Sequence, residues 1–174
     1  TFNPDEVADN IAGLIGDACC VALVRPGDRV EVVAVSHRKS DARKLLRELV
    51  ALTGFPITST LMGLGAYPAS GKNWLGMLGM HGTYEANMAM HDCDVMLCVG
   101  ARFDDRITGR VDAFSPGSKK IHIDIDPSSI NKNIRVDVPI IGDCANVLGD
   151  LLQVFKAEAK KPDIKAWWQQ IAQW

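Results

Sequence analysis

The sequence predicts an α/β fold in which a mostly parallel sheet has helices on both faces, giving three layers. Apolar runs of strand length alternate with stretches of helix length along the chain, the order typical of parallel strands joined by crossover helices. The run DVMLCV at 94–99 is continuously apolar, as a strand buried on both faces should be. Leu45, Leu49 and Leu52 recur at spacings of four and three, which predicts a helix with one buried face.

Composition supports a folded protein and excludes several partners. The 174 residues are 47% hydrophobic and 23% charged, which excludes wholesale disorder. Net charge is −2, and no apolar run approaches the ~20 residues of a membrane span, so we expect neither a nucleic-acid nor a membrane partner. The opening TFNPDEVADN is polar and acidic, unlike a cleavable signal. We therefore expect a cytoplasmic protein.

The five cysteines predict neither a disulfide framework nor a metal site. Their number is odd, two are adjacent, and no CxxC pair occurs. We expect most of them to be small, reduced core residues.

The first 40 residues predict one helix and two strands. Asn3 can cap a helix that runs to about Gly16, with Pro4 in its first turn. Strands are expected at 19–25 and 29–36, joined by a Pro-Gly-Asp turn.

The following segment predicts a helix, a strand and a long glycine-rich loop. The helix covers 41–52 and ends at Gly54, and the strand covers 57–60. The stretch 61–82 is too glycine-dense for a plain connector, so we expect it to be a functional loop without regular structure.

The second half continues the alternation of helix and strand. In chain order we expect a helix at 83–91, strands at 94–99, 120–126 and 138–141, a helix at 144–159 and an amphipathic tail helix. We assign 1–160 to one domain and 161–174 to a helical linker. Trp167, Trp168 and Trp174 on this tail predict an interface with a neighbouring domain.

Four predicted strands end in polar or glycine-rich residues, and parallel strands bring such ends to one edge of the sheet, where ligands bind. These ends are Thr60-Leu61-Met62-Gly63, Gly100-Ala101-Arg102, Asp124-Ile125-Asp126 and Gly142-Asp143.

Two glycine patterns lie in the 61–82 stretch. Gly63 and Gly65 begin a GxGxxG pattern, but Pro68 replaces its third glycine, so a turn open to a ligand is favoured over a dinucleotide fingerprint. GMLGMHG at 76–82 could place backbone N–H groups against a flat ring or phosphate. A flexible loop is the alternative, and the lone His81 has no Ser or Cys partner for a triad.

Charged side chains follow two strands. Arg102, Arg106 and Arg110 are suited to a diphosphate, with two aspartates between them, although a solvated mixed-charge loop would have the same composition. Asp124 and Asp126 share one face of a strand end and could accept ribose hydroxyls or form a turn. We assign no catalytic residue and no metal ligand.

Beyond these patterns, the chain resembles the central domain of the acetohydroxyacid synthase (acetolactate synthase) large catalytic subunit. The segments that carry the resemblance are LLRELVALTGFPITSTLMGLGAYPAS, WLGMLGMHGTYEANMAMHDCDVMLCVGARFDDRITGRVDAFSPGS and KIHIDIDPSSINKNIRVDVPIIGD. The resemblance implies a six-stranded, Rossmann-like sheet of the DHS-like NAD/FAD-binding type that carries a structural FAD. Thiamine diphosphate and magnesium would belong only to the complete enzyme.

The resemblance also implies a set of FAD contacts, which run from the flavin side through the diphosphate to the adenosine end. They are Thr60, Leu61, Met62, Leu78, Gly79, Met80, His81, Gly100, Ala101, Arg102, Asp104, Arg106, Ile107, Asp124, Ile125, Gly142, Asp143 and Cys144.

The function implied is that of one domain of a transferase that condenses pyruvate with a 2-oxo acid in branched-chain amino acid biosynthesis. The chain alone should be inactive, with the other synthase domains and a homo-oligomer as partners.

Residues 1–40 diverge from the family and place bulky side chains where its glycines approach FAD. The alternative is a free-standing, non-catalytic binding or interaction domain that has lost flavin binding. The middle domain of a sister enzyme, such as pyruvate oxidase or glyoxylate carboligase, is disfavoured by MLGMHGTYEAN and GARFDDR.

Overall fold

The structure is a computed structural model that describes residues 30–34, 40–157 and 162–174. The helix expected at 3–16 and the strand expected at 19–25 lie outside these residues. Within them, six strands form one sheet in the order β3-β2-β1-β4-β5-β6, and every neighbouring pair is parallel. The strands are β1 (Val30–Ala34), β2 (Ile57–Ser59), β3 (Trp74–Met77), β4 (Val95–Val99), β5 (Lys119–Asp124) and β6 (Val138–Ile141). The predicted α/β class with parallel strands is confirmed.

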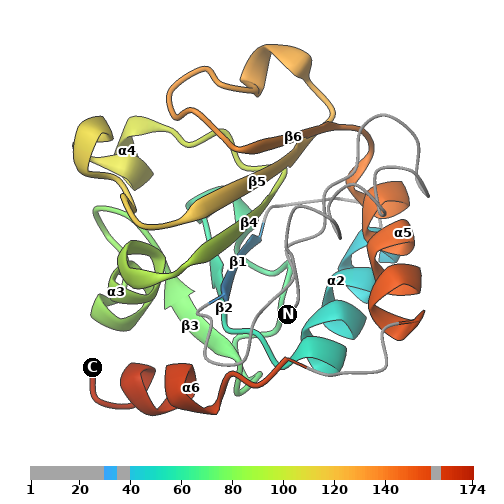
Figure 1. Cartoon of the computed structure of the whole chain (residues 1–174), viewed down its shortest axis with the longest axis horizontal. Coiled ribbons are helices and arrows are strands. Elements are labelled where there is room, and N and C mark those ends of the chain that lie inside the picture. Colours follow the sequence, from blue (N-terminus) through green and yellow to red (C-terminus); the bar gives the residue numbers. More distant parts are fainter. Residues whose placement is uncertain (1–29, 35–39, 158–161) are drawn as a thin grey trace, which may run out of the picture.

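Helices lie on both sides of the sheet. Figure 1 shows α2 (Ser40–Thr53) and α5 (Cys144–Ala157) side by side on one face and α3 (Tyr84–Asp92) on the other. A single turn, α4 (Asp105–Thr108), follows β4, and α6 (Lys165–Ile171) ends the chain. Short 3₁₀ turns occur at Leu61–Gly63, Val111–Ala113 and Pro127–Ser129.

The buried faces of the helices follow the predicted periodicity. Leu46, Leu49 and Val50 of α2 are buried, as are Leu148 and Leu151 of α5. Complete burial of such a side chain contributes about 1.5–3 kcal/mol. The apolar stripe of each helix therefore accounts for the tight pairing of α2 with α5 above the sheet.

One strand lies where the sequence predicted only a loop. β3 forms inside the glycine-rich stretch and pairs with β2 through an irregular register. Gly76 has a φ of +115°, and a Cβ there would lie 2.6 Å from the Thr83 side chain. Thr83 Oγ1 donates to the Leu75 carbonyl at 2.7 Å. Glycine in a strand commonly marks such a close approach, and it also hides the strand pattern from the sequence.

The tail forms the expected helix, but one of its tryptophans is not at an interface. Trp167 is 1% exposed and belongs to the hydrophobic core together with Ile171. Its ring meets Trp174 edge to face, with centroids 5.6 Å apart. Trp168 Nε1 donates to the Gly54 carbonyl at 3.0 Å. The prediction of an interface role is therefore wrong for Trp167, because this ring fills the core of its own domain.

The described cysteines are core residues, as predicted. Cys93, Cys98 and Cys144 are buried, whereas Cys19 and Cys20 lie outside the described residues. Burial raises the pKa of the Cys144 thiol to about 11, so this group stays protonated near neutral pH. None of the helices in the described part is long and apolar enough to cross a membrane.

Candidate functional site

A groove of about 880 Å³ lies at the carboxyl ends of the strands. Its walls come from segments at or after the ends of β2, β3, β4 and β5, so parallel pairing gathers residues up to 69 positions apart in the chain, from Thr60 to Ser129. Strands β1 and β4 are neighbours at the centre of the sheet, and the strand order runs outward from them in both directions. Ligands in open α/β sheets bind outside this switch point.

Most of the predicted site residues line this groove. They are Thr60, Leu61, Met62, Leu78, Met80, His81, Gly100, Ala101, Arg102, Asp104, Arg106, Ile107 and Asp124. Met77, Asp105, Asp126 and Ser129 line it as well. The gathering of strand ends predicted from the sequence is therefore observed for three of the four ends.

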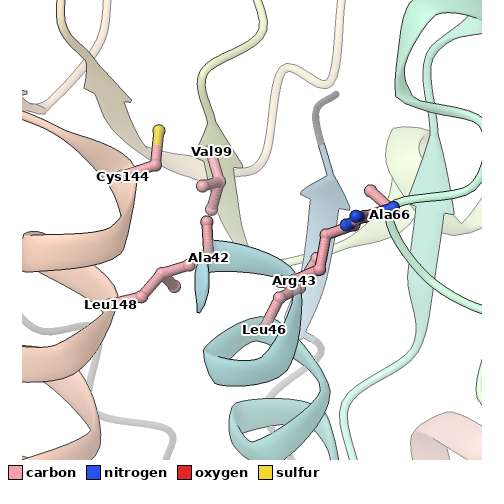
Figure 2. Close-up of a pocket in the computed structure, with 7 residues that line it drawn as sticks. All are labelled: Ala42, Arg43, Leu46, Ala66, Val99, Cys144 and Leu148. Atoms are coloured by element: carbon pink, nitrogen blue, oxygen red, sulfur yellow. The ribbon is translucent and has the colours of Figure 1, made fainter. Parts of the chain in front are cut away.

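The remaining predicted site residues lie elsewhere, and their proposed contacts stay predictions. Ile125 is exposed beside the groove. Gly142 N donates to the Asp124 carbonyl at 3.0 Å, and Asp143 Oδ1 accepts from Ala145 N at 2.9 Å at the start of α5. Cys144 and Leu148 line a narrow apolar cavity between α2 and α5 (Figure 2). The volume of this cavity, about 10 Å³, leaves no room for a cofactor.

Gly79, the last of this group, serves close packing between two loops. A Cβ at Gly79 would lie 2.5 Å from the Arg106 carbonyl oxygen, and its φ is +93°. Met80 N donates to that same oxygen at 2.8 Å. Asn87 brackets Gly79, accepting from its N–H at 2.8 Å and donating to its carbonyl at 3.0 Å. Gly79 is thus needed for contact with α4, which the flexible-loop alternative did not anticipate.

Two of the three arginines face the groove. Arg102 Nη2 lies 2.8 Å from Asp104 Oδ2, and Arg106 Nη1 lies 3.5 Å from Asp105 Oδ2. Both guanidinium groups are largely exposed. Arg110 instead forms two bonds to Asp112, at 2.8 and 2.9 Å, and does not line the groove. The arrangement therefore separates the three arginines that the sequence pattern grouped together.

The two aspartates after β5 differ in environment. Asp124 is 7% exposed, and its Oδ1 accepts from Asp126 N at 2.9 Å. Asp126 accepts from both the N–H and the hydroxyl of Ser128 at 2.9 Å, and these bonds hold the pKa of Asp126 below its usual value. Asp126 therefore forms the turn that was one of its two predicted roles, and it also lines the groove.

Sequence reasoning missed the buried histidine beneath this edge. His122 is 0% exposed, and its Nε2 lies 3.7 Å from Asp124 Oδ2. Burial lowers the pKa of His122, and the nearby Asp124 carboxylate opposes that shift only in part. The alternation of Lys120, His122 and Asp124 along one strand was the available signal, because alternate residues share a face.

Two further residues were missed because they lie behind the groove. Phe103 has a left-handed backbone, with a φ of +52°. Asn133 Nδ2 donates to the Phe103 carbonyl at 3.0 Å.

The described residues hold no group of three or more His, Cys, Asp or Glu side chains that could bind a metal ion.

Comparison with known proteins shows the family to which the chain belongs. The sequence model of the family described as "Thiamine pyrophosphate enzyme, central domain" matches residues 29–151. The chain belongs to this family of central domains. The region that the family's sequence model matches contains α2, α3, α4, every strand of the sheet and most of α5.

The relatives that this central domain matches are much longer proteins. It is 54% identical over 121 residues to the acetolactate synthase large subunit of Haemophilus influenzae, covering 68% of this chain and 21% of that protein. It is 51% identical over 132 residues to the acetolactate synthase isozyme 3 large subunit of Escherichia coli, covering 74% and 23%. For the acetolactate synthase of Mycobacterium avium the identity is 46% over 132 residues, covering 75% and 21%. The matched part of this central domain thus corresponds to less than a quarter of each relative's length.

Proposed function

We propose that this chain is the FAD-carrying central domain of an acetolactate synthase large subunit. The supporting observation is the order of side chains along the groove. Exposed apolar side chains follow β2 and β3, two guanidinium groups beside two carboxylates follow β4, and carboxylates without a guanidinium stand at the end of β5. This order parallels that of an elongated flavin dinucleotide, which has a flat ring at one end, a diphosphate in the middle and a ribose at the other end.

The residues of the groove fit the chemistry of that cofactor. The volume of about 880 Å³ lies within the roughly 300–1,000 Å³ range of small-molecule sites. Leu61, Met62 and Met80 are exposed apolar side chains that can cover a ring. Arg102 can meet a phosphate through charge-assisted hydrogen bonds, and the Asp124 carboxylate can accept from a ribose hydroxyl.

In this proposal the chain's own residues bind and orient the cofactor and carry out no chemical step. FAD supplies a structural element of the enzyme, not a redox centre for its main reaction. Asp126 and its bonds to Ser128 hold the loop after β5 against the groove. The contact between Gly79 and Arg106 joins the apolar section of the wall to the section that carries the arginines.

The complete enzyme would condense pyruvate with a second 2-oxo acid in branched-chain amino acid biosynthesis. Thiamine diphosphate and magnesium would bind to other domains, which are this domain's partners within a cytoplasmic homo-oligomer. Because the chain spans only about a fifth to a quarter of the length of its relatives, we expect it to have no synthase activity alone.

Spectroscopy of the purified 174-residue chain tests the proposal. The chain should bind FAD in a one-to-one ratio, with a shifted visible spectrum and a change in flavin fluorescence. Riboflavin, which lacks the diphosphate, should bind much more weakly. Protein that stays colourless after incubation with FAD would refute the proposal and favour a non-catalytic domain without flavin. Formation of acetolactate from pyruvate by this chain alone would also contradict it.

A further inference from the structure

Phe103 adopts a strained backbone conformation between two residues that line the groove. Its φ of +52° is in a region that side chains of this size rarely occupy. Residues in such regions persist only where the surrounding structure holds them, and they cluster at ligand sites. Arg102 and Asp104, its neighbours in the chain, both line the groove. The strained residue therefore lies within the section of the wall that carries Arg102.

Three contacts hold Phe103 in place. Its ring meets Phe114 and His122 edge to face, with centroid distances of 5.7 and 5.1 Å. Asn133, on the segment after β5, donates from Nδ2 to the Phe103 carbonyl at 3.0 Å. Phe103 is 3% exposed, so both its ring and its peptide group are fixed from behind the groove.

The carboxylate of Asp104, the next residue in the chain, pairs with Arg102 and does not cap the helix that follows. Asp104 is the N-cap of α4, a position where an aspartate ordinarily accepts from the first turn of the helix. Here its side chain makes no capping bond. Asp104 Oδ2 instead accepts from Arg102 Nη2 at 2.8 Å, and this bond holds the guanidinium at the groove wall.

We infer that Phe103 and Asn133 are positioning residues of the proposed FAD groove, which hold Arg102 and Asp104 in place for the cofactor. Neither residue is part of the groove wall, so their effect on binding passes through Arg102 and Asp104. The inference rests on the proposed function, because positioning has a consequence only if the groove binds the nucleotide.

Substitution of Asn133 tests the inference, with a matched control at Asn73. Asn73 Nδ2 also donates to backbone carbonyls, those of Gly54 and Phe55 at 2.9 and 3.1 Å, but it lies at the amino ends of β2 and β3, away from the groove. We expect Asn133→Ala to weaken FAD binding about fivefold or more. Asn73→Ala should leave the FAD dissociation constant within about twofold of wild type, even if it lowers the thermal midpoint equally. Asn133→Asp, which keeps the shape but lacks the amide donor, provides a second variant should Asn133→Ala fail to fold.

A double-mutant cycle separates positioning from a general loss of structure. If Asn133 acts through Arg102, adding Asn133→Ala to Arg102→Ala should weaken FAD binding little further. The slope of log Kd against log salt should also fall in Asn133→Ala, because the phosphate contact is the salt-sensitive one.

Three results would overturn the inference. In the first, Asn133→Ala binds FAD as tightly as Asn73→Ala does. In the second, the fold-increase in the FAD dissociation constant of the double variant equals the product of the increases caused by Asn133→Ala and Arg102→Ala separately. Either result refutes the positioning role while the wild-type titration still supports the proposed function. A wild-type chain that binds no FAD refutes both.

Discussion

Arg102 stands directly after the central strand β4, where the proposed diphosphate would lie. Its guanidinium pairs with Asp104 at 2.8 Å while both side chains remain about half exposed. Exposed ion pairs contribute only about 0–1 kcal/mol. The guanidinium can therefore take a phosphate as an additional partner, beside Asp104, at little energetic cost.

Replacement of Arg102 tests this assignment at the level of one side chain. Arg102→Ala should weaken FAD binding by about 1.5–3 kcal/mol, because a charge-assisted bond to phosphate is lost. Arg110→Ala is the matched control, since Arg110 pairs with Asp112 and does not line the groove. Equal FAD affinities of the two variants in a fluorescence titration would remove Arg102 from the role.

His122 should make the stability of the domain sensitive to acid. Burial depresses its pKa in the folded state, whereas the unfolded value is about 6.5. Below about pH 6.5 the unfolded chain gains a proton that the folded chain does not, so stability falls as pH decreases toward the folded pKa, with a slope of at most ~1.4 kcal/mol per pH unit.

Urea unfolding of wild type and His122→Gln between pH 7.5 and 5 measures this effect. The variant has no group that titrates at this position, so its free energy of unfolding should decline less steeply than that of wild type. His91→Gln, a change at an exposed histidine, is the control for the loss of an imidazole at the surface. Identical slopes for wild type and His122→Gln would contradict the assignment.

At the scale of secondary structure, the loop after β3 and the short helix α4 form one wall of the groove. Their backbones meet at Gly79 and Arg106, where there is no space for a side chain. This contact joins the residues expected at the flavin ring to those expected at the diphosphate. A change that separates the two segments should therefore affect both stability and cofactor binding.

A pair of glycine substitutions isolates that contact. Gly79 and Gly65 have similar φ values of +93° and +89°, but a Cβ at Gly65 has nothing within 4 Å. Both changes to Ala incur the backbone penalty, and only Gly79→Ala adds a collision with the Arg106 carbonyl. We expect Gly79→Ala to lower the free energy of unfolding by about 1–3 kcal/mol more than Gly65→Ala. Equal losses in urea unfolding would show that the loop can move away from α4.

The regular elements could be predicted from the sequence where periodicity is strong. The apolar run of β4 and the leucine stripe of α2 led to correct elements, and parallel pairing then predicted the shared edge that holds Arg102 and Asp124. β3 was missed because Gly76 interrupts its pattern. The left-handed backbone of Phe103 depends on contacts with Asn133, 30 residues away, and no local pattern reports such a contact.

At the scale of the domain, the tail completes the core. Trp167 and Ile171 of α6 are buried in the same hydrophobic cluster as Leu49 and Phe55. The sheet whose loops carry the proposed cofactor contacts therefore shares one hydrophobic core with α2, α5 and α6. The relatives that this domain matches are much longer proteins, and the role proposed for the domain is to carry FAD.

A crystal structure of the chain grown with FAD tests that role most directly. We predict electron density for one extended FAD across the carboxyl ends of the strands. Its ring should lie beside Met80, its diphosphate at Arg102 and its adenosine ribose near Asp124. An empty groove at saturating FAD, or FAD bound on another face of the sheet, would contradict the account.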